Sequence, residues 1–226
     1  MDQAAFCCDL GLMAYAEAYR LQVQLVERRR QGQLERDVFL ALEHPSVFTL
    51  GRRGVRAHLF RDEAFLRRHG IDLMQIERGG EITFHGPGQL VVYAILDLRR
   101  AGLSVSGHVE RLEAVMLALA ADFGVQAGRD ERNRGVWVRD RKLGSVGIAI
   151  RHGISFHGLG LNVSTDLTPF AWINPCGLAG VRMTTLALER GAPCDMAAVK
   201  TRLMAHLGAV FARPIISVGA DALLPA

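Results

Sequence analysis

Long apolar runs are absent from this sequence, although half of its 226 residues are hydrophobic. No stretch approaches the roughly 18 apolar residues that a membrane-spanning helix needs. The first residues, Met1–Ala5, carry no basic segment, and Cys7, Cys8 and Asp9 follow, which is unlike a secretory signal. We therefore expect a cytoplasmic protein without a membrane partner.

Cysteine is scarce, and its spacing excludes a zinc site of the Cys-x-x-Cys type. The four cysteines are Cys7, Cys8, Cys176 and Cys194. In a reducing compartment such cysteines are usually small buried hydrophobic residues and not disulfides. We expect no metal, and we apply the same interpretation to Cys176 unless its surroundings argue otherwise.

Lysine is scarcer still, because Lys142 and Lys200 are the only lysines among 27 basic residues. The net charge is +4, and arginine runs such as Arg28–Arg30 and Arg52–Arg53 could bind nucleic acid or an acidic protein surface. No interleaved aromatic residues and no RNA-binding motif accompany these runs, so they are interpreted as solvated helix ends and loops. We expect no nucleic-acid partner.

Hydrophobic periodicity predicts an α+β fold. Residues at helical spacing indicate helices and one short helical turn, at about 12–30, 62–69, 106–123, 195–211 and 168–172. Apolar runs bounded by turn residues indicate strands at 37–42, 47–50, 72–76, 90–98, 136–138, 142–150 and 154–163. Hairpin pairing in two groups favours mixed or antiparallel sheets over an alternating βαβ series. Ser106 is a candidate N-cap, and no linker divides the chain, so one domain over residues 1–226 is expected.

The stretch from Arg78 to Gln89 contains four glycines, a proline, an arginine and a histidine directly before an apolar strand. Glycine permits positive φ and lets a ligand approach the backbone closely. Arg78 and His85 add a fixed cation and a titratable ring. For an isolated loop of this kind, an ordinary long turn is the simpler interpretation.

Two residues in the second half of the chain suggest nucleophilic chemistry. Lys142 begins an apolar, glycine-rich strand, where a partly desolvated ammonium would have a depressed pKa and could act as a base. Cys176 lies in an Asn-Pro-Cys-Gly turn that would expose its thiol. A thiol with a pKa of about 8.5 is mostly protonated at neutral pH, and a nearby lysine ammonium would stabilise the thiolate. A strand-end lysine that reaches water explains Lys142 equally well.

The strand at 154–163 carries Gly158 and Gly160. These glycines leave room beside the backbone for an acyl chain or for an oxyanion held by amide groups. His157 could approach Cys176 in space, as could His85, but an ordinary core histidine is the simpler interpretation of His157.

Four motifs together resemble the octanoyltransferases of lipoic-acid synthesis. They are Arg78-Gly79-Gly80-x-x-Thr83-Phe84-His85-Gly86-Pro87-Gly88-Gln89, Lys142-Leu143-Gly144-Ser145-Val146-Gly147, Gly158-Leu159-Gly160-Leu161-Asn162 and Asn174-Pro175-Cys176-Gly177. The segment 43–51 is also similar, and the resemblance spans about 37–190. It implies a biotin/lipoate protein ligase-like fold with mixed or antiparallel sheets flanked by helices, and a family-like core over about 37–214.

The resemblance also implies roles for the residues of these motifs. Cys176 resembles a nucleophile that forms an acyl-thioester intermediate, and Lys142 resembles its activating partner. The residues that resemble acyl-substrate contacts are Arg78, Gly79, Gly80, Glu81, Ile82, Thr83, Phe84, His85, Ser145, Val146, Gly147, Gly158, Leu159 and Gly160. At Gly160 many family members carry alanine, a departure that would widen the acyl pocket slightly and leave the chemistry intact.

The implied reaction is transfer of an octanoyl group from octanoyl-acyl carrier protein to a lysine amine of a lipoyl domain, the first step of protein lipoylation. The implied acceptors are the lipoyl domains of 2-oxoacid dehydrogenase complexes and the glycine cleavage H protein. Thioester exchange is near thermoneutral and amide formation is downhill, so no ATP, metal or other cofactor is expected. We expect a monomer whose basic charge steers two acidic protein partners.

Three other interpretations remain open. An ATP-dependent lipoate or biotin ligase on the same fold would use a lysine and an adenylate, with no need for a cysteine at position 176. An arginine-rich nucleic-acid-binding module predicts affinity that falls steeply with salt, but it leaves Lys142 and Cys176 unexplained. A cysteine-dependent hydrolase or amidotransferase would be distinguished by its products with and without a lysine acceptor.

Overall fold

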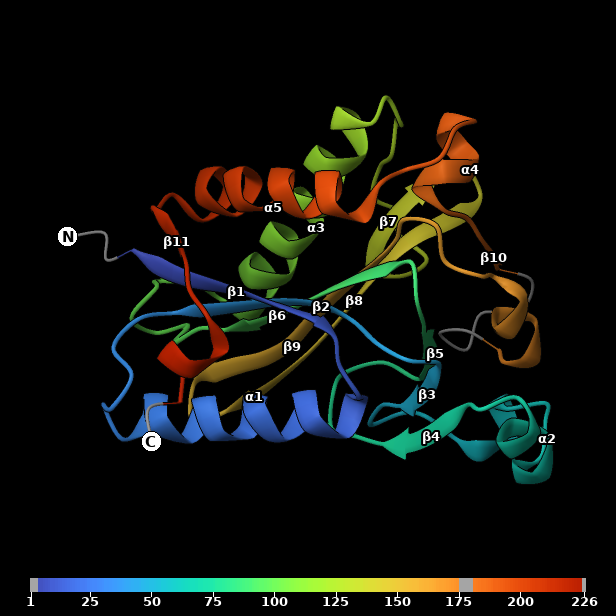
Figure 1. Cartoon of the computed structure of the whole chain (residues 1–226), viewed down its shortest axis with the longest axis horizontal. Coiled ribbons are helices and arrows are strands. Elements are labelled where there is room, and N and C mark those ends of the chain that lie inside the picture. The colour runs from blue at the N-terminus through green and yellow to red at the C-terminus, as the bar shows by residue number, and fades with distance from the viewer. Residues whose placement is uncertain (1–3, 175–180, 225–226) are drawn as a thin grey trace.

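The computed structural model describes residues 4–174 and 181–224. Two β-sheets and the helices around them form the α+β fold with mixed sheets that the sequence predicts. In Figure 1 the larger sheet lies between helix α1 (Tyr15–Arg30) on one side and helices α3 (Val105–Asp122) and α5 (Met196–Phe211) on the other. None of the described helices is long and apolar enough to cross a membrane.

The larger sheet combines parallel and antiparallel pairs. Its strands follow the order β10-β8-β9-β6-β2-β1-β11, and β7 pairs with β8. Strands β8, β9, β6 and β2 are successive antiparallel neighbours, whereas β1 is parallel to β2 and β11, and β10 is parallel to β8. The strands are β1 Ala5–Leu12, β2 Val38–Glu43, β6 Gln89–Ile95, β7 Gly135–Val138, β8 Arg141–Arg151, β9 Ile154–Asn162, β10 Arg182–Met183 and β11 Ile215–Ser217.

A smaller sheet has the strand order β4-β3-β5 within the described residues. Strand β3 (Val47–Leu50) is parallel to β4 (Asp72–Gln75) and antiparallel to β5 (Ile82–His85). Phe48 and Phe84 contribute to the apolar cluster of this sheet. Strand β5 of the smaller sheet is followed closely by β6 of the larger sheet. This short connection holds the glycine-rich stretch against the larger sheet.

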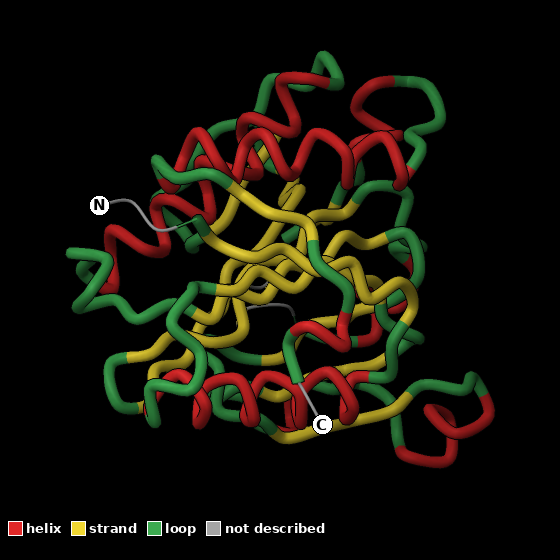
Figure 2. Tube along the Cα trace, turned by 60° about the vertical axis from the view of Figure 1, so that its left-hand side comes forward, coloured by secondary structure: helices red, strands yellow, loops and turns green. Residues whose placement is uncertain are grey.

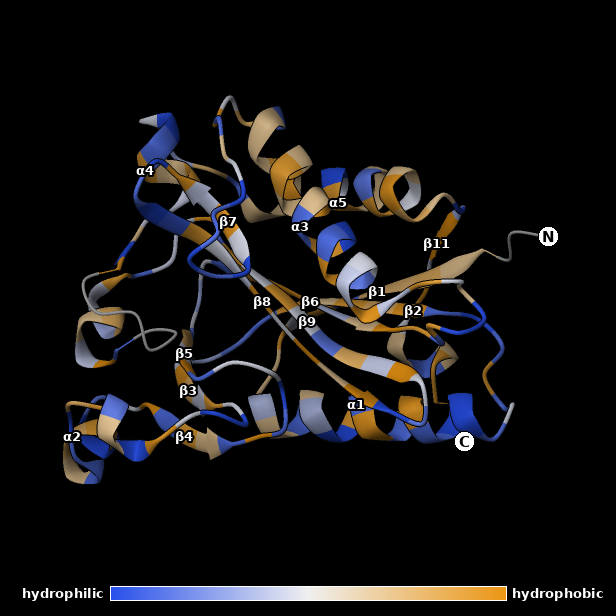
Figure 3. Cartoon of the chain, turned by 180° about the vertical axis from the view of Figure 1, so that it is seen from behind, coloured by the Kyte–Doolittle hydropathy of each residue, from blue (hydrophilic) through white to orange (hydrophobic). Residues whose placement is uncertain are grey.

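Helices cover both faces of the larger sheet, as Figure 2 also shows. Figure 3 shows hydrophilic and hydrophobic residues alternating along α1, as expected for a helix with one face against a sheet. One apolar cluster joins the sheet to α3 and α5, and a second joins it to α1. The other helices of the described residues are α2 Glu63–Arg68, α4 Leu186–Arg190 and the 3₁₀ turns Arg56–His58, Thr168–Trp172 and Ala220–Ala222.

Two helix starts follow the sequence signals, and a third needs correction. Asp62 caps α2 and Asp195 caps α5 through side-chain hydrogen bonds to backbone N–H groups. Helix α3, however, is capped by Ser104, whose Oγ accepts from the Gly107 N–H, and not by Ser106. Ser104 and Ser106 have the same side chain, so only the backbone geometry decides which of them is the cap.

Several short strands were not predicted. Among the described residues, strand β1 pairs with β2 and β11, and both partners are distant in sequence. The sequence predicts a helix from about residue 12, but Leu12 is the last residue of β1 and α1 begins at Tyr15. Strand β5 lies inside the stretch interpreted as a loop, because its glycines hide four residues that pair with β3. The prediction that Cys7, Cys8 and Cys194 are buried is confirmed.

Asp37 is a buried carboxylate that fastens three segments at one end of the larger sheet. It accepts a hydrogen bond from Arg29 at the end of α1, at 2.7 Å, and it also pairs with Arg213 before β11. The Asp97 backbone N–H after β6 donates to the same carboxylate at 3.2 Å. Charge-assisted bonds of this kind offset the desolvation of a buried carboxylate.

His108 of α3 is fully buried, with 0% of its surface exposed. Neither of its ring nitrogens has a hydrogen-bond partner among the described residues. Burial lowers the pKa of His108 to about 4. An unfolded histidine titrates near pH 6.5, so the unfolded chain takes up this proton first as the pH falls.

His108→Leu should therefore make the protein less sensitive to acid. Between pH 7 and pH 5 the wild type should lose about 2 kcal/mol more unfolding free energy than the variant, because only its unfolded state gains the proton at position 108. Urea denaturation at the two pH values measures the difference. As a control in the same helix, Leu112→Val should cost about 1 kcal/mol equally at both. Equal losses in wild type and His108→Leu would contradict the prediction.

Candidate active site

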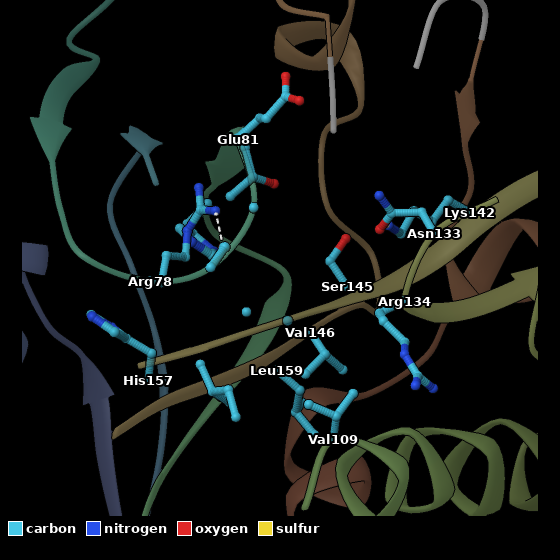
Figure 4. Close-up of a pocket in the computed structure, with 18 of the residues that line it drawn as sticks. Arg78, Glu81, Val109, Asn133, Arg134, Lys142, Ser145, Val146, His157 and Leu159 are labelled. Carbon is cyan, nitrogen blue, oxygen red and sulfur yellow. Dashed lines mark hydrogen bonds between the residues drawn. The ribbon is translucent and has the colours of Figure 1, made fainter. Parts of the chain in front are cut away.

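A cleft of about 890 Å³ opens where β8, β9, the start of α3, the glycine-rich stretch and the loop 129–134 meet. Figure 4 shows its walls, with Arg78 and Glu81 on one side and Lys142, Asn133 and Arg134 on another. Apolar side chains form part of the lining, namely Val105, Val109, Val146, Ile148 and Leu159. The cleft can therefore accommodate an elongated apolar group beside polar ones.

The predicted segments of β8 and β9 lie directly opposite each other. Ser145, Val146 and Gly147 pair with Gly160, Leu159 and Gly158, and all six residues line the cleft. Gly158 is required by packing, because a Cβ there would lie 2.1 Å from the Val92 carbonyl oxygen. At Gly160 a Cβ would lie 3.3 Å from Gln89 Oε1, so an alanine would press on that amide.

The glycine-rich stretch is held against β8 by its backbone and by Arg78. The Gly79 N–H donates to the Ile148 carbonyl at 2.8 Å. Arg78 donates from Nη2 to the Thr49 carbonyl at 2.7 Å and to its hydroxyl at 2.9 Å. A Cβ at Gly147 would lie 3.1 Å from Arg78 Cδ. The missing side chain at Gly147 is therefore what permits this close approach.

Seven of the eight predicted residues in this stretch line the cleft. They are Arg78, Gly79, Gly80, Glu81, Ile82, Thr83 and His85. Phe84 does not, because its ring is buried in the small apolar cluster, to which Ile82 on the same face of β5 also contributes. There its ring centroid lies 5.4 Å from that of Phe48 and 5.5 Å from that of Phe170.

Lys142 is almost completely buried, with 1% of its surface exposed. Its Nζ donates to Asn133 Oδ1 at 2.8 Å and lies 5.3 Å from the centroid of the Trp137 ring. In Figure 4 Lys142 and Asn133 lie together beside Ser145. The alternative of a strand-end lysine that reaches water is therefore wrong for this residue.

The loop that carries Asn133 is fastened to α3 by Glu113. This carboxylate is 1% exposed, and it accepts hydrogen bonds from the Gly135 N–H at 2.8 Å and from Arg129 Nε at 2.9 Å. Gly135 has a φ of +127°, and a Cβ there would lie 3.1 Å from Lys142 Cε. Glu113 and Gly135 thus fix the side of the cleft on which the Lys142 ammonium lies.

Sequence reasoning did not find Asn133 or Glu113. Asn133 lies in a charged, turn-like segment that gives no sign of a buried contact. Glu113 did leave a signal, because it is an acidic residue one turn from Val109 and Met116 on a helix whose inner face is apolar. A carboxylate on such a face needs a partner.

Cys176 lies outside the described residues, so its position relative to Lys142 is not described. The chain is described again from Val181, and β10 follows at once. In that strand Met183 pairs with Lys142, and the Thr184 N–H donates to the Lys142 carbonyl at 2.9 Å. Thus the strand that begins six residues after Cys176 runs beside the lysine.

Histidine and tyrosine rings gather around His85 on the cleft wall. His44 has one ring nitrogen 2.7 Å from the Met13 carbonyl and the other 2.7 Å from the Tyr93 hydroxyl. Burial lowers the pKa of His44 to about 4 and that of His85 to about 3. Burial likewise raises the pKa of Tyr93 well above its usual value. These histidine and tyrosine rings are therefore neutral at physiological pH, and the fixed charge beside them is that of Arg78.

His157 is a core histidine in an unusual backbone conformation. It is 1% exposed, has a φ of +58°, and neither ring nitrogen has a described hydrogen-bond partner. Its backbone N–H donates to Gln22 Oε1 at 2.8 Å, and its ring stacks on those of Phe156 and Tyr19. Burial, followed by the charge of Arg78, lowers its pKa to about 3. Within the described residues, no group of three or more histidine, cysteine or acidic side chains is arranged to hold a metal ion.

Comparison with known proteins places the chain in a family. A model of the lipoyl protein ligase A/B catalytic domain matches residues 14–208. An octanoyltransferase from Desulfotalea psychrophila is 53% identical over 209 residues, which cover 92% of this chain and 94% of that protein. One from Syntrophobacter fumaroxidans is 42% identical, with 94% and 93% covered.

A solved structure has the same fold. It is a bi-partite lipoate protein ligase from Thermoplasma acidophilum, with a TM-score of 0.74, 13% identity, and 98% of this chain and 90% of that chain covered. At this identity the likeness concerns the fold alone, and the membership rests on the family model and the curated relatives. The chain therefore belongs to the octanoyltransferases within the lipoyl protein ligase A/B catalytic-domain family.

Proposed function

We propose that this protein transfers an octanoyl group from octanoyl-acyl carrier protein to a lysine amine of a lipoyl domain, through a thioester on Cys176 activated by Lys142. The observation that carries the proposal is the buried Lys142 ammonium at the wall of a partly apolar cleft. The choice of an octanoyl group rests on the octanoyltransferases that are 53% and 42% identical to the chain.

The cleft suits this substrate in its chemistry. An octanoyl chain has no polar atoms beyond its carbonyl, and the valine, isoleucine and leucine side chains of the lining can bury it. Because the glycines of β8 and β9 have no side chain, the acyl chain can lie close to the backbone of these strands. Backbone N–H groups near the glycines can bind a developing oxyanion.

In the first step the Cys176 thiolate attacks the carbonyl carbon of the carrier thioester. A new C–S bond forms to Cys176, the C–S bond to the carrier breaks, and Lys142 gives a proton to the departing carrier thiolate. The ammonium that stabilised the Cys176 thiolate thereby becomes a neutral amine. Asn133 Oδ1 remains a hydrogen-bond acceptor for it in either state.

In the second step the lysine amine of the lipoyl domain attacks the Cys176 acyl-thioester. A C–N bond forms, the bond to Cys176 breaks, and the Lys142 amine takes up the proton that the nucleophile loses. The product is an octanoyl amide, and both catalytic groups return to their starting states. The step consumes a thioester, so the proposal includes no ATP and no metal.

The proposal also includes the acceptor proteins, the location and the oligomeric state. The acceptors are lipoyl domains of 2-oxoacid dehydrogenase complexes and the glycine cleavage H protein. The enzyme acts in the cytoplasm as a monomeric, single acyltransferase domain. Its formal charge of +4 favours encounter with acidic partners.

Cys176→Ala should abolish both the acyl-enzyme and the transfer. Intact mass after incubation with octanoyl-acyl carrier protein should increase by one octanoyl group in the wild type and not in the variant, and hydroxylamine should remove the adduct. Cys194→Ala is the control and should keep the adduct. Full transfer by Cys176→Ala would contradict the covalent route, and a requirement for ATP would favour a ligase.

Lys142→Met should raise the pKa of the Cys176 thiol towards the value of about 8.5 for a free thiol, because it removes the cation. The acylation rate at pH 7 should fall about 100-fold. Ultraviolet absorbance of the thiolate measures the titration, in which Cys7 and Cys8 stay protonated because burial raises the pKa of both thiols, that of Cys7 to about 12.

Two further variants sharpen this test. Asn133→Leu removes the acceptor of the ammonium and should change the thiol titration in the same direction by a smaller amount. Lys200→Met replaces the other lysine, which pairs with Asp9 at 2.7 Å, and should leave the titration as it is. An unchanged titration in Lys142→Met would exclude its activating role.

A further inference from the structure

A chain of hydrogen bonds leads away from His85 on the cleft wall. His85 Nδ1 lies 2.6 Å from Gln89 Oε1, and Gln89 Nε2 donates to Asn162 Oδ1 at 2.8 Å. Asn162 Nδ2 in turn donates to the Thr184 carbonyl at 3.1 Å. Gln89 and Asn162 are 4% and 1% exposed, so water does not compete for these bonds.

Two backbone carbonyls fix the direction of every bond in this chain. A carbonyl oxygen can only accept, so the Thr184 carbonyl requires the NH₂ group of Asn162. The Phe84 carbonyl, 3.3 Å from Gln89 Nε2, requires the NH₂ group of Gln89. Gln89 Oε1 therefore faces His85, and because an amide oxygen only accepts, His85 Nδ1 must carry the proton.

This tautomer leaves Nε2 of His85 with a lone pair. No described residue donates a hydrogen bond to that atom, and the ring lines the cleft. Burial holds the pKa of His85 at about 3, so the ring is neutral at physiological pH. A neutral ring of this tautomer offers an acceptor to the cleft and no donor.

The two substrates of the proposed function, the acyl thioester and the acceptor amine, need different hydrogen-bond partners. The carbonyl oxygen of the acyl thioester needs a donor, which Nε2 cannot supply. The incoming amine brings N–H groups and needs an acceptor. The tautomer therefore matches the second substrate and excludes His85 from stabilising the oxyanion.

We propose that His85 Nε2 accepts a hydrogen bond from the amine of the acceptor lysine and so directs the nitrogen lone pair at the acyl carbonyl. This inference rests on the proposed function. His85 is then a catalytic residue that keeps its own protonation state, since the proton lost by the nucleophile passes to Lys142. Gln89 and Asn162 are positioning residues that set the tautomer.

The tautomer can be measured without any activity assay. In ¹⁵N-labelled protein at pH 7, the His85 ring should give a pyrrole-like Nδ1 signal and a pyridine-like Nε2 signal, assigned by their loss in His85→Phe. Gln89→Leu removes the acceptor of the Nδ1 proton and should shift both signals towards a mixture of tautomers. A pyridine-like Nδ1 in the wild type would overturn the proposal.

The role in the reaction is tested by following the two half-reactions separately. The ratio of the aminolysis rate to the acylation rate should fall about tenfold in His85→Phe and about threefold in Gln89→Leu. His69→Phe replaces an exposed histidine at the C-terminal end of α2, which does not line the cleft, and should keep the wild-type ratio. Thermal melting checks that each variant is folded.

The outcomes separate this inference from the function on which it rests. An unchanged ratio in both variants, or a loss confined to acylation, would overturn the role of His85 while leaving the covalent route intact. A wild type that forms no acyl-enzyme would overturn the proposed function and the aminolysis role with it. In that case the ¹⁵N signals would still report whether the hydrogen-bond chain fixes the ring.

Discussion

The antiparallel pairing of β8 with β9 is the contact on which the rest of the site depends. It places Ser145, Val146 and Gly147 opposite Gly160, Leu159 and Gly158, and a shift of one residue would turn these side chains to the other face. The absence of a side chain at Gly147 lets Arg78 and Gly79 lie on the strand. The cleft is therefore a product of strand register and missing Cβ atoms more than of any flexible loop.

The polar groups of the cleft are held by different means. The Lys142 side chain is buried with the Asn133 amide and the Trp137 ring, and Glu113 holds the loop that supplies Asn133. Burial keeps His44 and His85 neutral. His85 thus offers an uncharged acceptor, and the fixed charge beside it is that of Arg78.

Much of this could be predicted from the sequence, and the failures have physical causes. Periodicity identified α1, α3 and α5, because each helix carries its own apolar face. It missed β1 and β11, since parallel pairing with distant strands leaves no local pattern. The motifs identified about half of the cleft lining, but not that β5 would turn Phe84 inwards. Asn133 bonds Lys142 only nine positions away, whereas the tautomer of His85 depends on the bond between Gln89 and Asn162, 73 positions apart, and hydrophobic periodicity encodes neither contact.

Helix α3 supplies both Glu113, which anchors the loop next to the lysine, and Val105 and Val109, which form part of the apolar wall. Under the proposed function, one rigid element would therefore set both the extent of the acyl pocket and the placement of the Lys142 side chain. Any evolutionary change in chain-length preference that moved this helix would also displace the cation. New acyl specificities should consequently arise by exchanging the two valines for larger or smaller residues, with the helix backbone left in place.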